Sequence, residues 1–466
     1  MFKINRKDSE GNLVNVEFQW DKDHLFDKAE TEKLFEKCQK KQEAVVKSII
    51  GSEKQKFRPV PLTTVALQKL AASKLKISSH RLMDIAEKLY NRGFISYPRT
   101  ETDFFSNTIN VRGLLDVQRH HVEWGQYAAN LLDNDGFQWP RRGKHDDKAH
   151  PPIHPVMMVR KDDPSLTNDE WRVYELVTRH FLACCSKDAN GYETVVNIEI
   201  GKEGFHAKGL VINELNWLEI YPYEKWVGNT LPEFKEKERF IPKELKLKDS
   251  KTSPPFLLTE QELIGLMDQN GIGTDATIAE HIRTIQDRRY AEKKGSFFRP
   301  TKLGEALVDA YEATGTDLWK PFLRASMEAR MTEISKGNLE KDKFLNDCLS
   351  EMEEIFLKMR SKEDVILDAM TKHFKGVRLN SSDAETTAID LDNLDLTEFK
   401  VIAEDEGTCG NCNGKSVRIL ENEDGVRIAH CSVDNLVLKI PKKGEVKLKD
   451  ATCPLCSFQV SVMKNC

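Results

Sequence analysis

The sequence has 466 residues, a formal net charge of −5, 39% hydrophobic residues and 31% charged residues. This length favours two to four structural units over a single core. No apolar run is long enough to span a membrane, which argues against a membrane protein. The small negative charge excludes a general polycation, so any contact with nucleic acid should come from local basic clusters.

The first part of the chain predicts a short strand and turn, then a charged helix, and then two further helices. The strand and turn contain Phe18 and Trp20, and the charged helix runs from about Glu30 to Gln42. After a proline-containing loop, helical patterns resume. The second of these helices begins after a pair of serines suited to an N-cap and ends at Gly93, and its apolar face consists of Leu82, Ile85, Ala86 and Leu89. Tyr97 therefore follows directly after a helix end.

Residues 186–250 have the pattern of strands. The runs TVVNIEI, FHAKGLVI and WLEIYPY are β-branched or aromatic, and they alternate in part between apolar and polar positions. Glycine and charged residues separate the runs. The sequence therefore predicts a strand-rich segment between helical ones.

A helix-turn-helix pattern follows this segment. Thr259 and Glu262 have the spacing of a capping box, and Gly271 suits the end of that helix. A second helix should begin near Ala276, after the short glycine-containing turn GIGTDAT. Such a turn opens onto a helix N-terminus, where backbone amides favour a phosphate, although Gly-Ile-Gly alone is usually just a turn.

Charged helices are expected to continue to about Phe374. Residues 381–407 are mostly acidic and polar, which is typical of a linker. The D-x-D pair Asp390 and Asp392 falls in this linker, with no buried strand before it, so we interpret it as solvated charge and not as a metal site.

The stretch GFISYPRTETDFF raises the question of whether the Tyr97 hydroxyl performs chemistry. Pro98 favours extended backbone at Tyr97, so Arg99 should project from the same side. A phenol is a weak nucleophile that needs a nearby cation, and a guanidinium can bind two oxygens of a phosphate. The pair therefore suits attack on a phosphodiester. For these three residues alone, a buried tyrosine beside a solvated arginine is the commoner arrangement.

The longer string GFISYPRTETD resembles the active-site signature of type IA DNA topoisomerases, in particular topoisomerase III of the eukaryotic alpha type. Three more stretches resemble family segments in the same order, namely DDKAHPPIHP, RHFLACCSKDANGYETVV and TSPPFLLTEQELIGLMDQNGIGTDATIAEHI. The resemblance covers residues 1 to about 372. It implies a multidomain α+β fold in which helical nucleophile and DNA-groove domains are joined by a strand-rich gate arch, followed by a small zinc-binding tail.

The resemblance also implies the domain boundaries. Two parts of the gate arch would be residues 1–57 and 186–255, and the helical domain carrying the catalytic tyrosine would be residues 58–185. The helical single-strand DNA-groove domain would be 256–372, the acidic linker 373–407, and the cysteine-rich tail 408–466.

Roles for individual residues follow from the same resemblance. Tyr97 would take the 5′ phosphate of a cut strand, Arg99 would hold the scissile phosphate, and His150 would assist nearby. Lys148 would contact the DNA backbone, and the single strand would meet Thr274, Asp275 and Thr277. A loop or capping histidine and a solvated lysine are the plainer interpretations of His150 and Lys148.

The implied activity is cleavage of one strand, ATP-independent strand passage and religation. The sequence accordingly lacks a G-x-x-x-x-G-K-[ST] phosphate loop. The family carries a TOPRIM domain whose acidic cluster holds Mg²⁺, and we expect that domain to lie ahead of this chain, so that the isolated chain relaxes supercoils poorly. The alternative is a non-catalytic fragment that binds single-stranded nucleic acid.

The ten cysteines are concentrated in the tail, where they suggest metal binding in a reducing compartment. Cys409 with Cys412 and Cys453 with Cys456 form two C-x-x-C pairs suited to Zn²⁺. The gap between the pairs is long, so Cys431 is a possible substitute ligand. By resemblance, the partners are single-stranded DNA, with RNA as an alternative, together with a RecQ-family helicase and an OB-fold cofactor. The resemblance also implies a nuclear location and a role in DNA recombination and repair.

Overall fold

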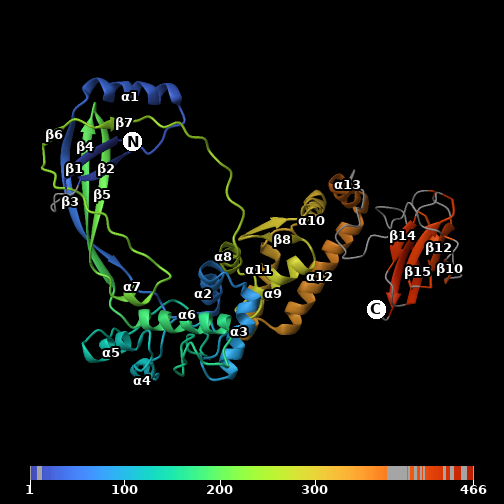
Figure 1. Cartoon of the computed structure of the whole chain (residues 1–466). Coiled ribbons are helices and arrows are strands. Elements are labelled where there is room, and N and C mark those ends of the chain that lie inside the picture. The colour runs from blue at the N-terminus through green and yellow to red at the C-terminus, as the bar shows by residue number, and fades with distance from the viewer. Residues whose placement is uncertain are drawn as a thin grey trace. The chain divides into compact units, whose positions relative to one another are not determined.

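The computed structural model describes most of the chain up to Phe374 and part of the tail (Figure 1). The described residues are 2–7, 13–374, 396, 399–402, 407–409, 412, 415–423, 425–433, 437–440, 445–452 and 459–464. The chain divides into two compact units. The first comprises Met1–Gln286 with Lys293–Arg299, and the second comprises Asp287–Glu292 with Pro300–Cys466.

A seven-stranded sheet in the first unit is built from segments that lie far apart in the sequence. Its order is β6-β3-β4-β5-β2-β1-β7, and the paired strands are antiparallel. The strands are β1 (Phe2–Lys7), β2 (Leu13–Trp20), β3 (Ala44–Lys56), β4 (Ala189–Ile200), β5 (Glu203–Glu214), β6 (Arg239–Phe240) and β7 (Glu244–Leu245). The predicted runs TVVNIEI and FHAKGLVI lie in β4 and β5, and β3 joins them from the N-terminal stretch. The prediction was wrong for WLEIYPY, whose first four residues form the short helix α7 (Trp217–Ile220) and bury Trp217, Leu218 and Ile220.

One end of this sheet has its own apolar core. The buried side chains include Val16, Phe18, Val46, Ile198 and Phe205. Helix α1 (Lys28–Lys41) packs at the same end, where the Cys38 thiol donates to the carbonyl oxygen of Ile200 at 3.3 Å (Figure 1). The predicted charged helix is confirmed.

The helical part of the first unit surrounds a second core. Its elements are α2 (Thr64–Leu70), the π-helical turn η1 (Ala71–Leu75), α3 (Ser79–Asn91), α4 (Val111–Gln118), α5 (Gly125–Asp133), α6 (Asn168–Cys184) and α7 (Trp217–Ile220). The predicted helix before Tyr97 is confirmed as α3. Ser78 caps its first turn, its predicted apolar face is buried, and Gly93 beyond its end has φ +75°.

The predicted helix-turn-helix is also confirmed. Helix α8 (Glu260–Gln269) begins at a capping box formed by Thr259 and Glu262, and α9 (Ile278–Asp287) follows the turn that contains Gly271, with φ +64°. The buried carboxylate of Glu260 accepts hydrogen bonds from the backbone N–H and the hydroxyl of Ser79, at 2.7 and 2.8 Å. This contact fastens α8 to the start of α3. The hairpin β8 (Ala291–Lys294) and β9 (Phe297–Pro300) comes next.

Among the described residues, the second unit contains four helices and the strands of the tail. The helices are α10 (Lys302–Ala313), α11 (Phe322–Ser335), α12 (Lys341–Arg360) and α13 (Glu363–Phe374), so the charged helices predicted up to about Phe374 are present. The tail strands are β10 (Lys400–Val401), β11 (Gly407–Thr408), β12 (Lys415–Glu421), β13 (Arg427–Cys431), β14 (Val437–Ile440), β15 (Glu445–Thr452) and β16 (Gln459–Lys464). Most of the predicted linker, with Asp390 and Asp392, lies outside the described residues. Across the described helices, none combines the length and apolar character needed to cross a bilayer.

Candidate active site around Tyr97

The backbone on both sides of Tyr97 is held by two other segments of the chain. On one side, the Ser96 N–H donates to the carbonyl oxygen of His154 at 2.9 Å, and the His154 N–H donates to the Ser96 hydroxyl at 3.0 Å. On the other side, the buried Thr64 hydroxyl donates to the Pro98 carbonyl oxygen at 2.7 Å, and it accepts the Thr100 N–H at 2.8 Å. Since Thr64 begins α2, a rigid element fixes this loop.

The Tyr97 ring is half-buried and lies among other rings. Its centroid is 4.7 Å from that of His150, with the ring planes tilted by 37°, and 5.3 Å from that of Tyr90, edge to face. Tyr97 is therefore not a residue of the apolar core. The structure brings Tyr97 and His150 together, although more than fifty positions separate them in the sequence.

Arg99 lies two residues after Tyr97 in the chain, and two partners hold its guanidinium. Its Nε donates to the carboxylate of Glu87 on α3 at 2.9 Å, and one Nη forms an ion pair with the same carboxylate. The other Nη donates to the carbonyl oxygen of Ala276 at 3.1 Å. Arg99 thus connects the Tyr97 loop to α3 and to the turn before α9.

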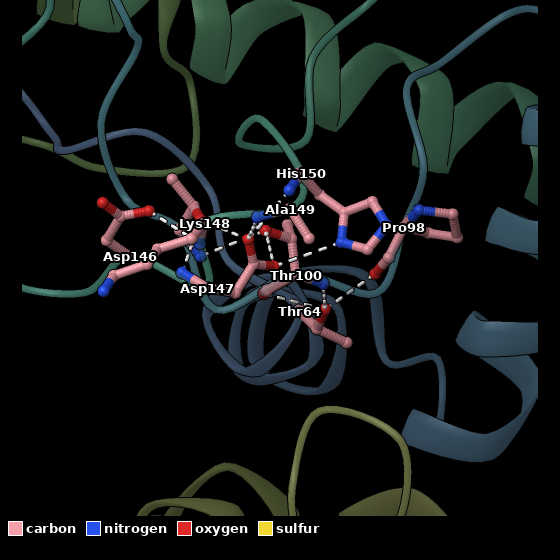
Figure 2. Close-up of polar contacts among 9 residues, drawn as sticks. Thr64, Pro98, Thr100, Asp146, Asp147, Lys148, Ala149 and His150 are labelled. Carbon is pink, nitrogen blue, oxygen red and sulfur yellow. Dashed lines mark hydrogen bonds and ion pairs between the residues drawn. The ribbon is translucent and has the colours of Figure 1, made fainter. Parts of the chain in front are cut away.

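Asp147 joins the Tyr97 loop to His150 (Figure 2). Its carboxylate accepts the hydroxyls of Thr100 and Thr102, each at 3.0 Å, and faces the Nδ1 of His150 at 3.3 Å. Partial burial by itself would raise the pKa of Asp147. Hydrogen bonds from the backbone N–H groups of His150 and Ala149 and from the two threonines outweigh burial and hold this pKa well below its ordinary value. The carboxylate is therefore ionised across the neutral range.

The basic loop that contains Lys148 is anchored to the Tyr97 loop. The buried carboxylate of Asp103 accepts the backbone N–H groups of Lys144 at 3.0 Å and His145 at 2.9 Å. Lys148 itself is exposed, has φ +59°, and donates its N–H to Asp146 at 2.8 Å. Lys148 is thus carried on a tight turn that is linked to the Tyr97 loop through Asp147 and Asp103.

Two of the residues predicted in the turn GIGTDAT, Thr274 and Thr277, form hydrogen bonds within the turn. The Thr274 N–H donates to the Thr277 hydroxyl at 2.9 Å, and the Thr274 hydroxyl accepts the Ala276 N–H at 3.2 Å. Asp275 is half-buried, and its charge, after burial, contributes to raising the pKa of Glu101. The Arg99 contact with Ala276 brings this turn close to the Tyr97 loop.

The tail brings three of the predicted metal-binding cysteines together. The sulfur atoms of Cys409, Cys412 and Cys431 lie within 4.8 Å of one another, with Cys412 and Cys431 3.8 Å apart. Two thiolates on one tetrahedral Zn²⁺ are about 3.8 Å apart, because each Zn–S bond is about 2.3 Å long. This donor set therefore fits a zinc site. Cys453 and Cys456 lie outside the described residues, so their predicted role as ligands stays a prediction.

The four cysteines before the tail occupy packing positions. Cys38, Cys184 and Cys185 are buried and Cys348 is half-buried, as predicted. Burial raises the pKa of both Cys184 and Cys185. These thiols are therefore protonated and unreactive at neutral pH.

Comparison with known proteins identifies the family. The family model described as DNA topoisomerase matches residues 2–346. The chain belongs to the DNA topoisomerase family. It is 42% identical over 418 residues to DNA topoisomerase 3-alpha of Arabidopsis thaliana, covering 89% of this chain and 44% of that protein. It is 44% identical over 361 residues to DNA topoisomerase 3 of Schizosaccharomyces pombe, covering 75% of this chain and 58% of that protein.

These relatives make the chain a type IA, topoisomerase III-like member of the family, as its motifs predicted. The chain spans about half the length of the curated relatives it matches. Among solved structures, full-length topoisomerase I from Thermotoga maritima matches with a TM-score of 0.58 at 21% identity, covering 96% of this chain and 67% of that chain. This likeness supports the mixed helix and strand fold.

Among the residues of this candidate site, Thr64, Glu87 and Asp147 were not predicted from the sequence. Asp147 had a local signal in the sequence. It stands three positions before His150, and an aspartate carboxylate often accepts hydrogen bonds from backbone N–H groups two or three residues later. Thr64 and Glu87 had none, because their contacts with the Tyr97 loop join residues 36 and 12 positions apart.

Proposed function

We propose that this chain carries the nucleophile of a type IA, topoisomerase III-like enzyme. The enzyme would cut one DNA strand through a 5′-phosphotyrosine link, pass another strand through the gap without ATP, and reseal the cut. The observation that carries the proposal is the arrangement at Tyr97. Its half-buried ring lies on a loop held from both sides, against His150, with Arg99 two residues further on.

In the cleavage step, the Tyr97 oxygen attacks phosphorus and loses its proton. The bond between phosphorus and the 3′ oxygen breaks, and that oxygen takes up a proton to become a free hydroxyl. Arg99 would stabilise the charge on the phosphate, and His150 would hold or move a proton beside the phenol. Religation is the reverse reaction, in which the phenolate is a good leaving group.

The described residues fit one of the two expected metal ions and not the other. Mg²⁺ prefers oxygen ligands, whereas among the described residues the only group of three His, Cys, Asp or Glu side chains close enough to hold one ion is the cysteine cluster. The described residues therefore do not fit a magnesium site, and we assign it no step here. Zn²⁺ bound by Cys409, Cys412 and Cys431 would supply folding energy to the tail.

A second candidate is a module that binds single-stranded nucleic acid without cutting it. The observation that favours it is the engagement of Arg99 by Glu87 and Ala276, which leaves the guanidinium partly neutralised. Both candidates would bind single-stranded DNA, and RNA is the alternative ligand.

The resemblance also predicts partners and a location for the protein. It predicts a RecQ-family helicase and an OB-fold cofactor as partners, a nuclear location, and roles in recombination and repair. These stay predictions.

Covalent trapping separates the two candidates. A single-stranded oligonucleotide labelled at its 3′ end is incubated with the 466-residue chain and the mixture is denatured, so that any 5′-phosphotyrosyl product keeps the label on the protein. We expect an adduct with the unmodified chain and none with Tyr97→Phe. Since the substitution removes only the hydroxyl, the affinity for the oligonucleotide should stay the same. Binding without an adduct in the unmodified chain would favour the second candidate.

A further inference from the structure

Asp147 has more contacts than a turn residue requires. One carboxylate oxygen, Oδ1, accepts the N–H groups of Ala149 and His150, both at 2.8 Å, and the Thr102 hydroxyl at 3.0 Å. The other oxygen, Oδ2, accepts the Thr100 hydroxyl at 3.0 Å and faces the His150 Nδ1 at 3.3 Å. The side chain is only 19% exposed.

The two oxygens of this carboxylate have different kinds of partner. Both backbone N–H groups that meet Oδ1 are obligatory donors, so an acceptor must always occupy that position. The partners of Oδ2 are a hydroxyl and an imidazole nitrogen, which can each donate or accept. With an ionised carboxylate in place, the imidazole nitrogen that faces it must carry the proton.

This arrangement sets the state of the His150 ring. The proton of the neutral imidazole resides on Nδ1, and Nε2 is left as the acceptor. The same carboxylate binds Thr100 and Thr102, which follow Tyr97 on its loop, so the ring of His150 and the Tyr97 loop share one anchor. The His150 ring then lies 4.7 Å from the Tyr97 ring.

We propose that Asp147 is a positioning residue that orients His150 against Tyr97 and keeps its proton on Nδ1, so that Nε2 is available to the reacting groups. The positioning itself stands on the contacts of Asp147, whereas its consequence for cleavage depends on the function proposed above. Carboxylates that orient a histidine in this way fix its tautomer in many other active sites.

The substitution Asp147→Asn tests this role without removing the turn. The amide oxygen must take the place of Oδ1, because two backbone N–H groups point there. The amide NH₂ group then occupies the place of Oδ2 and donates to the His150 Nδ1, which drives the imidazole proton to Nε2. A matched control is Asp146→Asn, because the carboxylate of the exposed Asp146 accepts the Lys148 N–H in the same turn and is not in contact with His150 in the structure.

The tautomer is read from ¹⁵N spectra of the full chain labelled at histidine, with the His150 signals assigned by comparison with His150→Gln. We expect the neutral ring to carry its proton on Nδ1 in the unmodified chain and in Asp146→Asn, and on Nε2 in Asp147→Asn. Adduct formation should fall about 10- to 100-fold in Asp147→Asn alone, while the affinity for single-stranded DNA changes less than about twofold.

The two measurements separate failure of this inference from failure of the proposed function. If neutral His150 keeps its proton on Nδ1 in Asp147→Asn, or if Asp146→Asn gives the same change, Asp147 does not position the ring. If the tautomer changes but adduct formation does not, the role in cleavage is wrong. If the unmodified chain forms no adduct at all, the proposed cleavage by this chain fails, and the tautomer measurement still decides whether Asp147 positions His150.

Discussion

The guanidinium of Arg99 donates to the backbone carbonyl oxygen of Ala276 at 3.1 Å, across 177 positions of sequence. The contact requires the planar fork of arginine, because a second nitrogen of the same group binds Glu87 at 2.9 Å. The loop of the proposed nucleophile and the turn before α9 are therefore held together by the residue proposed to bind the scissile phosphate.

Arg99→Lys should lower the rate of adduct formation about 100-fold, measured by trapping on a 3′-labelled single strand. An ammonium group is a compact point charge without the planar fork that reaches Glu87 and Ala276 on separate nitrogens, so both positioning and bidentate charge stabilisation are weakened. The control is Arg81→Lys, at an arginine that pairs with Asp169 and is 65% exposed. Equal rates for Arg99→Lys and the unmodified chain would contradict the assignment of Arg99.

The stability of the first unit should fall as the pH is lowered from about 6.5 to about 4. Burial lowers the pKa of His180 from 6.5 to about 4. The hydrogen bond between its Nε2 and the Val60 carbonyl oxygen raises this pKa, but by less than burial lowers it. The unfolded state then binds more protons than the folded state in this window. The stabilisation is fully present above pH 6.5 and decreases by about 1.4 kcal/mol per pH unit below it.

Urea unfolding followed by tryptophan fluorescence between pH 7 and pH 5 measures this slope. His180→Gln should reduce the slope, because glutamine keeps polar atoms at this site but does not titrate. Some slope should remain, since burial also lowers the pKa of His121 and His154. The exposed His120→Gln serves as the control, and an identical slope in both variants would exclude His180 as a source.

Gly143→Ala should destabilise the basic loop and lower adduct formation about tenfold. A Cβ atom at Gly143 would overlap the Asp103 carboxylate, which accepts the N–H groups of Lys144 and His145. The clash should cost about 2 kcal/mol of unfolding free energy. Gly265→Ala is the control, because a Cβ there meets only the Lys69 side chain at an ordinary distance of 3.6 Å.

A double substitution makes this prediction sharper. Once Asp103→Ala has removed the carboxylate, the added methyl group at Gly143 no longer meets the three atoms nearest to it. The cost of Gly143→Ala should then be smaller than in the unmodified chain, so the two effects should be less than additive. If the two costs in unfolding free energy are strictly additive, contact with Asp103 is not the reason why glycine is needed at position 143.

Cys431→Ser should weaken zinc binding by the purified chain at least about tenfold, measured by metal analysis after dialysis against a weak chelator. The reason is that its sulfur lies 3.8 Å from that of Cys412, the separation expected for two ligands of one Zn²⁺. Cys348→Ser, at a half-buried position on α12, should leave the zinc content unchanged. If Cys453→Ser loses zinc and Cys431→Ser does not, the ligands are the two C-x-x-C pairs and Cys431 is not one of them.

Local features of the fold could be predicted from the sequence. Ser78 caps α3, and Thr259 and Glu262 form the capping box of α8. Each of these depends on contacts between residues within one turn of helix, so the signal is contained in a short window. Strand β3 was not recognised, because its partner in the sheet is β4, about 140 positions away.

The sequence by itself determined which residues stand next to Tyr97 in the chain, the helix that ends before it, and the family to which its motifs belong. Only the tertiary structure decided what surrounds the Tyr97 ring, which carboxylate holds His150, and which cysteine joins Cys409 and Cys412. Chain neighbours follow from covalent bonds and local backbone preferences. The partners of a side chain across the fold depend instead on packing and hydrogen bonds such as that between Thr64 and Pro98, 34 positions apart, which exist only once the chain is folded.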